Sequence, residues 1–190
     1  MLMNKLKVRA HILDYLRRHN INNCLINDNN KIKLVNDLDT ICISYNVNIP
    51  GGVESDIHLY AEDMHIRAYY SQQVAEACKN SCNKEYLLNI INFINANVFF
   101  DSLYTPRLYL STDGYYDIAI TAVIPYDFFE LAPIETCEYI TAYCPEFLEK
   151  FAFPIIGLIH GTIPFNQAIF YIKKEILGDK NAVIEWEGDD

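Results

Sequence analysis

The sequence predicts an α+β fold in which an antiparallel β-sheet carries helices packed on one face. Two patterns indicate the sheet. Residues 40–49 alternate between apolar and polar side chains, and the Asp113-Gly114 pair separates two runs rich in aromatic and β-branched residues. A third pattern indicates helices, because apolar residues recur every three to four positions near the amino end and after Pro133. We expect one domain over residues 1–190.

The segment from Asn4 to His19 is predicted to be an amphipathic helix that ends at Asn20. Charged residues alternate there with apolar ones, and the apolar face needs a partner. We therefore place this helix at an edge of the sheet. Its apolar stripe is expected to consist of Leu6, Ala10, Leu13 and Leu16, with Ile12 beside them.

Strands are predicted between about residues 23 and 70. The runs CLIN and KIKLV flank Asp28, Asn29 and Asn30, which suit a hairpin turn. The run TICISYNVNI alternates most regularly, and DIHLYAEDMHIRAYY supplies two further strands on either side of Glu62 and Asp63. A polar connection is expected from residue 71 to residue 83.

An asparagine-rich helix is predicted over about residues 83–97. Its apolar stripe is Leu87, Ile91, Ile94 and Val98, and Asn89, Asn92 and Asn95 recur beside it at every third position. Asparagine is a poor helix former because its side chain competes for backbone groups. Two interpretations stay open. The asparagines form a solvated face, or Asn92 and Asn95 present their amides to the backbone of a neighbouring hairpin or loop.

The second half of the chain is predicted to hold a hairpin over about residues 106–124 and helices over about residues 127–177. In the hairpin, Asp113 and Gly114 are the residues that a type I′ turn requires. Four prolines, at positions 133, 145, 154 and 164, divide the helical region. We expect two or three short helices there.

The composition excludes several classes of function. The 190 residues are 51% hydrophobic, which is enough for a real core, and carry a net charge of −10 with a pI near 4.9. An acidic chain without a basic stripe is a poor ligand for nucleic acid or for an anionic membrane. Charges within the first twenty residues disfavour a signal peptide, so we expect a cytoplasmic protein.

Reactive residues form no recognisable catalytic motif. The chain lacks a phosphate-binding glycine loop, a nucleophile elbow and paired CxxC motifs, and its six cysteines are interpreted mostly as core residues. His58 and His65 flank a turn and would approach each other across a hairpin, but no ligand spacing supports a metal pair. We expect no catalytic residue, no cofactor and no metal.

The second half of the chain resembles a known family. A helix with an N-x-x-N pair (Asn92 and Asn95), an aromatic pair (Phe99-Phe100), a strand, the Asp113-Gly114 turn, a second strand and a long apolar helix are similar to the bacterial sensory transduction regulator family. The resemblance implies the fold of type III secretion chaperones: helix, three antiparallel strands, helix, two strands, helix. It also implies a non-catalytic, protein-interacting or regulatory role.

The function expected from the sequence is therefore polypeptide binding, as a chaperone-like or regulatory adaptor with a possible homodimer. Tyrosines suit a recognition surface, because each combines an apolar ring with a polar tip. Two alternatives stay open. One is a small-molecule sensor with a pocket lined by Tyr109, Tyr115 and Tyr116, and the other is an enzyme with a dispersed site.

Overall fold

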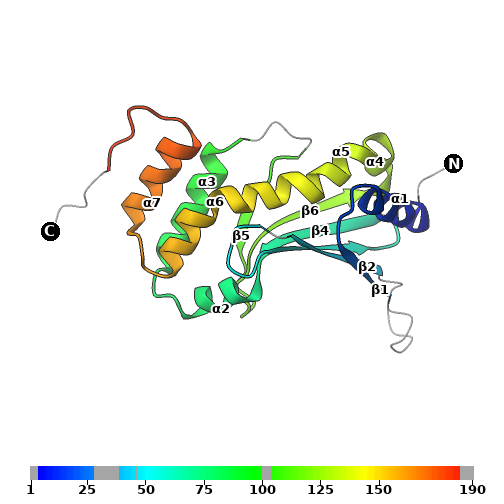
Figure 1. The fold of residues 1–190 in the computed structure, drawn as a ribbon, viewed down its shortest axis with the longest axis horizontal. Coiled ribbons are helices and arrows are strands. Elements are labelled where there is room, and N and C mark those ends of the chain that lie inside the picture. Colours follow the sequence, from blue (N-terminus) through cyan, green and yellow to red (C-terminus); the bar gives the residue numbers. More distant parts are fainter. Residues whose placement is uncertain (1–3, 28–38, 46, 100–103, 185–190) are drawn as a thin grey trace.

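The computed structural model describes residues 4–27, 39–45, 47–99 and 104–184 (Figure 1). Its elements follow the order α1 (Lys5–Arg18), β1 (Asn23–Asn27), β2 (Asp39–Tyr45), β3 (Val53–Leu59), β4 (Asp63–Tyr70), α2 (Gln72–Asn80), α3 (Lys84–Asn97), β5 (Leu108–Leu110), β6 (Ile118–Pro125), α4 (Tyr126–Leu131), α5 (Pro133–Glu138), η2 (Tyr139–Tyr143), α6 (Cys144–Ile159), α7 (Phe165–Tyr171) and η3 (Ile172–Ile176), where η marks a π-helical turn. The α+β class is confirmed.

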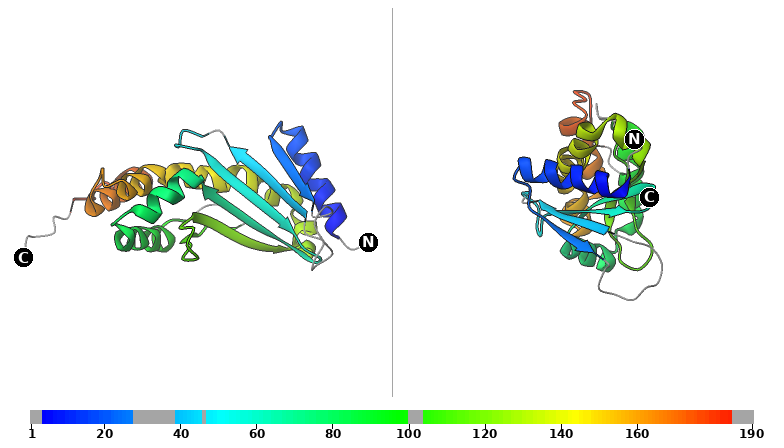
Figure 2. Two further views of the ribbon diagram at one scale, coloured as in Figure 1. Left: turned by 90° about the horizontal axis from the view of Figure 1, so that it is seen from below. Right: turned by 90° about the vertical axis from the view of Figure 1, so that its right-hand side faces the viewer.

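The strands form one antiparallel sheet in the order β1-β2-β3-β4-β6-β5. The first four strands are neighbours in sequence, and β6 then joins β4 and leaves β5 at the edge. In Figure 2, left, the strands lie in front of α6, which runs along the far side of the sheet. The opposite face of the sheet carries no described helix in that view.

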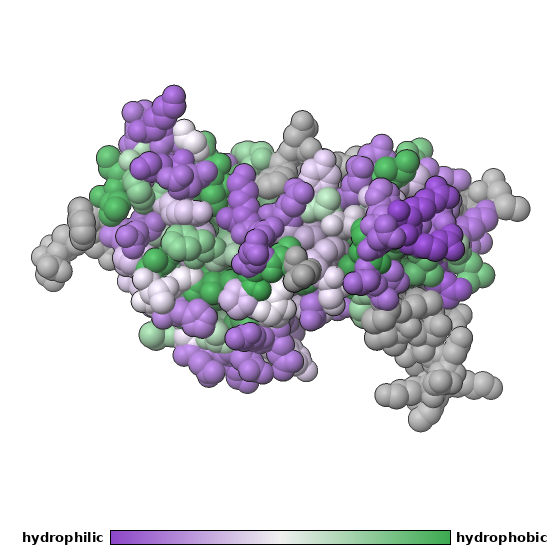
Figure 3. Space-filling model, in the orientation of Figure 1, coloured by the Kyte–Doolittle hydropathy of each residue, from purple (hydrophilic) through white to green (hydrophobic). Residues whose placement is uncertain are grey.

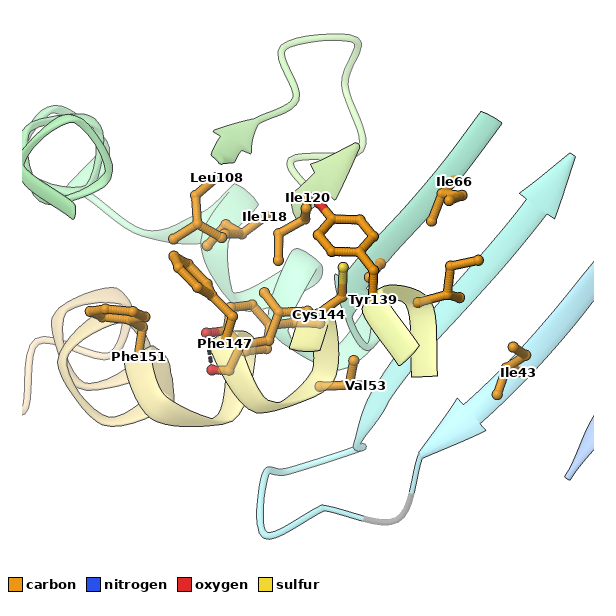
Figure 4. Packing of buried hydrophobic residues seen from close by; sticks show 14 of the residues in the cluster. Ile43, Val53, Ile66, Leu108, Ile118, Ile120, Tyr139, Cys144, Phe147 and Phe151 are labelled. Atoms are coloured by element: carbon orange, nitrogen blue, oxygen red, sulfur yellow. Dashed lines mark hydrogen bonds between the residues drawn. The ribbon is translucent and has the colours of Figure 1, made fainter. Parts of the chain in front are cut away.

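The core lies between the sheet and α6. Strands β3 and β4 bury every second residue, so Ile57 and Ile66 point toward the helix. From the other side, η2 and α6 contribute Tyr139, Phe147 and Phe151, which are at most 1% exposed. Figure 4 shows the Phe147 ring beside Leu108 and Ile118 and the Tyr139 ring beside Ile120, with Phe151 farther along α6. The space beneath the helix is therefore filled.

The first helix is confirmed in its bounds but not in its buried stripe. The Asn4 side chain caps α1 by accepting from the Lys7 N–H at 3.1 Å, and Asn20 has a left-handed φ of 54°. The buried residues are Val8, Ile12 and Leu16, spaced by four, whereas Leu6 is exposed. Both stripes satisfy helical spacing, so periodicity alone could not choose between them.

Two further findings concern the connections. Residues 71–83 are not a simple polar connection, because α2 forms there and buries Val74, Ala75 and Cys78. The second strand of the predicted first hairpin, KIKLV, and its turn lie outside the described residues, and β1 pairs with β2 instead. Among the described residues, no helix is long and apolar enough to cross a bilayer.

Two of the four prolines divide the carboxy-terminal helices as predicted, because α5 begins at Pro133 and α7 follows Pro164, whereas Pro145 and Pro154 do not. Segments α5, η2 and α6 run on without a break through Pro145 and Pro154. At the π turn the Cys144 N–H bonds to Tyr139 O, and Pro145 has no N–H to offer the next carbonyl, Ile140 O. The buried Tyr45 hydroxyl donates to Ile140 O at 3.0 Å. A side chain of β2 thus supplies the hydrogen bond that the proline removes.

Candidate binding surface on the open face of the sheet

The sheet face opposite α6, termed the open face, is polar and partly aromatic. Because side chains alternate along each strand, the residues between the buried positions of β2, β3, β4 and β6 all point to this side. Its described members are Thr40, Cys42, Ser44, Glu54, Asp56, His58, Asp63, His65, Arg67, Tyr69, Tyr109, Asp117, Thr121 and Val123. Val123 leaves 58% of its surface exposed.

Arg67, in the middle of β4, is fixed in place by two neighbours. Its Nη2 pairs with the Asp117 carboxylate, and its Nε donates to the Tyr109 hydroxyl at 3.2 Å. Burial opposes the charge on Arg67, but the influence of Tyr109 and Asp117 outweighs it and raises the pKa of the guanidinium. The guanidinium also lies 4.9 Å from the centre of the Tyr69 ring. The charge is therefore held by a carboxylate and a tyrosine hydroxyl beside the ring of Tyr69.

Tyr69 connects this group to the next strand. Its hydroxyl donates to the Asp56 carboxylate at 3.0 Å, and Glu54 lies opposite Tyr69 in the register of β3 and β4. Burial, followed by the nearby Asp56 charge, raises the pKa of Tyr69. Tyr69 therefore stays protonated at neutral pH and acts as a donor between carboxylates. The result is a row of hydrogen-bonded groups from β3 to β5 before any partner is present.

His58 and His65 are direct cross-strand neighbours, as their position around the turn predicted. His58 Nδ1 lies 3.0 Å from Thr40 Oγ1, and His65 Nε2 lies 3.4 Å from Asp63 Oδ1. The part of the chain that the structure describes holds no group of three or more histidine, cysteine or acidic side chains able to bind a metal ion. The pair is therefore part of the polar surface.

The asparagines of α3 differ in their roles. Asn95 Nδ2 donates to Leu108 O at 2.8 Å, and Asn95 Oδ1 accepts from Leu108 N at 2.9 Å. These are the two hydrogen bonds that the bridging interpretation requires of one amide. Asn89 and Asn92 lie on the exposed side of α3, and no hydrogen bond joins the Asn92 side chain to another described residue. Asn92 therefore fits the solvated interpretation.

Asn95 occupies the outer edge of the sheet. The Ser111 N–H donates to Asp117 O, and backbone directions alternate along a strand. The backbone N–H and C=O of Tyr109 therefore point toward β6, whereas those of Leu108 point away from it. A sheet edge normally exposes such N–H and C=O groups to any passing strand. The Asn95 amide satisfies both groups of Leu108 as a further strand would, so β5 is closed at this residue.

The predicted two-residue turn at Asp113 and Gly114 is wrong in its length. The β5-β6 hairpin exists, but residues 111–117 form its loop. Asp113 Oδ1 accepts from the Ser111 hydroxyl at 2.8 Å and from Tyr115 N at 3.2 Å, which organises a longer turn. The Ser111 hydrogen bond and then that of Tyr115 lower the pKa of Asp113. Gly114, with a φ of 99°, takes a conformation that favours glycine.

The three candidate tyrosines do not line one pocket. Tyr109 lies on the open face beside Arg67, and Tyr115 is 72% exposed in the hairpin loop. Tyr116 packs against the core from a left-handed φ of 60°, and Lys84 Nζ lies 5.0 Å from its ring centre. Of the three, Tyr109 belongs to the hydrogen-bonded network.

Two clefts lie away from the open face. One, of about 370 Å³, lies between the start of α3 and the α6–α7 connection, and Tyr86 and Phe165 stack at its side. The other, of about 350 Å³, separates α1 from α4 and α5, with Phe129, Pro133 and Ile134 opposite His11 and Arg18. Figure 3 shows hydrophilic residues over α1 with hydrophobic residues beside them.

The buried thiols are poor nucleophiles. Burial raises the pKa of Cys78 to about 11, and burial also raises the pKa of Cys137 and of Cys144 to about 12. Cys137 borders the cleft beside α1, where Asp14 is engaged by Arg17 and Arg18. These three cysteines behave as the small hydrophobic residues that the sequence predicted.

No protein-family model, curated protein or solved structure matches this chain. What can be said of the candidate surface therefore comes from its own residues. Sequence reasoning named Tyr109 but missed Arg67, Tyr69, Asp56 and Asp117. The alternation of DIHLYAEDMHIRAYY carried a signal for three of them, because it separates Asp56, Arg67 and Tyr69 from the apolar positions.

Proposed function

We propose that this protein is a non-catalytic polypeptide-binding module, a chaperone-like or regulatory adaptor that binds its partner on the open face. The observation that carries the proposal is the row of side chains already joined by hydrogen bonds: Asp56 with Tyr69, and Arg67 with Tyr109 and Asp117. Preorganised polar groups and aromatic rings lose little entropy on binding, which favours recognition.

The element order adds support. The order of a helix, antiparallel strands, helical structure, two strands and a long helix is similar to the one that the resemblance to sensory transduction regulators and type III secretion chaperones implies, although two helices, α2 and α3, stand where that order has one. This chain has one strand more before the helix pair, and it has several short helices after the second pair of strands. The Asn95 closure disfavours strand addition at Leu108 of β5, one of the two edges of the sheet.

A capture experiment tests the proposal. The tagged protein is incubated with native cytosol, and retained polypeptides and small molecules are measured by mass spectrometry. One variant carries Thr121→Arg and Val123→Arg, both at exposed positions of the open face. A matched control carries Leu88→Arg and Leu177→Arg, which add the same charge at an exposed position of α3 and at the exposed residue that follows η3.

We expect a polypeptide to be retained in stoichiometric amount by the native protein and by the control, and to be lost from the open-face variant. Equal retention by all three proteins would contradict the proposal. So would the retention of a small molecule without any protein.

A second candidate function is small-molecule sensing, which the cleft between α1 and α5 favours. Its wall combines Phe129, Pro133 and Ile134 with polar groups of α1, as ligand sites commonly do. An Ile134→Glu variant that loses a metabolite retained by the native protein would support this function. An enzymatic role is less favoured, because the thiol nearest this cleft, Cys137, stays protonated at neutral pH.

A further inference from the structure

The open face has the size of a protein interface. Strands β3, β4 and β6 have seven or eight residues each, and six strands lie side by side. At about 4.8 Å between strands and about 3.4 Å per residue, the face offers on the order of 600 Å². Each partner of a standard interface contributes about 800 Å², so one partner could cover most of the face.

The charge of the face selects among possible partners. The described residues of the open face include one cation, Arg67, and four carboxylates, those of Glu54, Asp56, Asp63 and Asp117. Arg67 is neutralised by Asp117, so the other three carboxylates dominate the potential. Like charges facing each other across an interface are unfavourable. This sign disfavours nucleic acid, an anionic membrane and a second copy of the same face.

Glu54 and Asp56 also retain capacity to accept hydrogen bonds. Both lie on β3 with their side chains half-exposed, and no described lysine or arginine forms an ion pair with either. Tyr69 donates one hydroxyl hydrogen to this pair, whereas two carboxylates can accept several hydrogen bonds. A partner's ammonium or guanidinium group would fill the remaining positions, while Tyr69 beside them and Val123, two strands away on β6, would contact its apolar parts.

We propose that the open face binds a basic polypeptide segment, whose lysine or arginine side chains pair with Glu54 and Asp56 while apolar side chains lie on Tyr69 and Val123. This inference rests on the proposed function and names the chemistry of the partner.

The test measures binding of two fluorescent synthetic peptides of about twelve residues to the full chain. One peptide alternates lysine with valine and threonine, and the other replaces each lysine by glutamate. The face variant is Glu54→Gln with Asp56→Asn, which keeps the side-chain sizes and an acceptor for Tyr69. The matched control is Glu146→Gln with Glu175→Gln, two residues on helices.

We expect the lysine peptide to bind the native protein and the control alike, and the face variant about tenfold more weakly. Binding should weaken as NaCl rises from about 0.05 to about 0.3 M, and the glutamate peptide should not bind. Equal weakening by both variants would reveal only attraction to the overall negative charge and would overturn the inference. Unchanged binding by the face variant would also overturn it.

Failure of this inference is distinguishable from failure of the proposed function. If the polypeptide captured from cytosol is lost with Thr121→Arg and Val123→Arg but retained with Glu54→Gln and Asp56→Asn, the face binds a polypeptide without using these carboxylates. If sedimentation shows a dimer that the face variant strengthens, the occupant is a second copy, which contradicts the basic partner.

Discussion

The two faces of the sheet use the same strands in opposite ways. Toward α6, strand residues such as Ile57 and Ile66 are fully buried, as is Phe147 of α6 itself, and stability there comes from apolar area removed from water. On the open face, Arg67 and Tyr69 keep partial contact with water, and their hydrogen bonds determine position more than stability. The difference teaches that the same strands are stabilised by apolar burial on one face and ordered by partly hydrated hydrogen bonds on the other.

The sharpest test of this contrast is the pair Phe147→Ala and Phe153→Ala, two positions on α6. Phe147 is buried against the sheet, whereas Phe153 is 55% exposed. We expect Phe147→Ala to lower the free energy of unfolding by about 3–5 kcal/mol, because it leaves a cavity. Phe153→Ala should change it by about 0.5 kcal/mol or less. Urea denaturation measures both, and equal losses would contradict the contrast.

Alkaline pH should lower the free energy of unfolding through the buried thiols. Cys78, Cys137 and Cys144 have folded-state pKa values of about 11 to 12 against an ordinary value of 9.0. The unfolded chain therefore releases these protons first, so the stability that the buried thiols contribute is complete below pH 9 and is lost as pH rises from 9 toward 11. Each thiol should contribute a decrease of about 1.4 kcal/mol per pH unit in this window.

Urea midpoints measured between pH 8 and pH 10.5 check the alkaline prediction. A Cys144→Ala variant should be less stable at neutral pH but should show a shallower decrease with pH. Replacement of the exposed Cys82 by alanine should leave the slope unchanged. A slope that is independent of Cys144 would show that other groups control the alkaline loss.

The stability of the protein should depend on Asn95, which binds the β5 edge of the sheet, and not on Asn92. Asn95→Ala leaves the N–H and C=O of Leu108 without their partner, which should cost about 1–3 kcal/mol. Asn92→Ala should be neutral or stabilising by a few tenths of a kcal/mol, because alanine is the better helix former. Thermal unfolding of both single variants decides the matter. Similar losses in the two would contradict the distinct roles.

The smallest effect on stability is expected on the open face. Arg67→Met removes the pair with Asp117 and the hydrogen bond to Tyr109, but the guanidinium is partly exposed. We expect a loss of about 1 kcal/mol or less in the free energy of unfolding. A loss as large as that of Phe147→Ala would show that the open face holds the fold together. Partner capture should suffer more than stability does.

The sequence predicted those parts of the molecule that a short local pattern determines. The alternation around Ile41 and Ile43 and the stripe from Leu87 to Val98 were enough to place strands and the asparagine-rich helix. Local patterns failed where distant residues decide. Pro145 was expected to divide the helices, but Tyr45, one hundred positions earlier, donates the hydrogen bond that this proline cannot. The turn at Asp113 failed because the Ser111 side chain stabilises a longer loop.

The candidate surface was predicted less well than the fold, for a related reason. Tyr109 could be named because it lies in a strand that the sequence predicts. Asp117 comes within hydrogen-bonding distance of Arg67 only because β6 pairs with β4 in the folded protein. No spacing in the sequence relates positions 67 and 117. The role of Asn95 was among the expectations because an amide can imitate a peptide group, but the choice between Asn92 and Asn95 depended on where β5 lies.

The two hydrogen bonds of Asn95 make the protection of the β5 edge depend on the position of α3. The Asn95 amide occupies the backbone N–H and C=O of Leu108, to which the backbone of another strand would otherwise bind. Any fluctuation that lifts α3 from the sheet would remove this amide and free the Leu108 backbone for pairing with other molecules. Because α3 also contributes Leu87, Ile90, Ile91 and Ile94 to the core, exposure of this edge and loss of core packing should occur together.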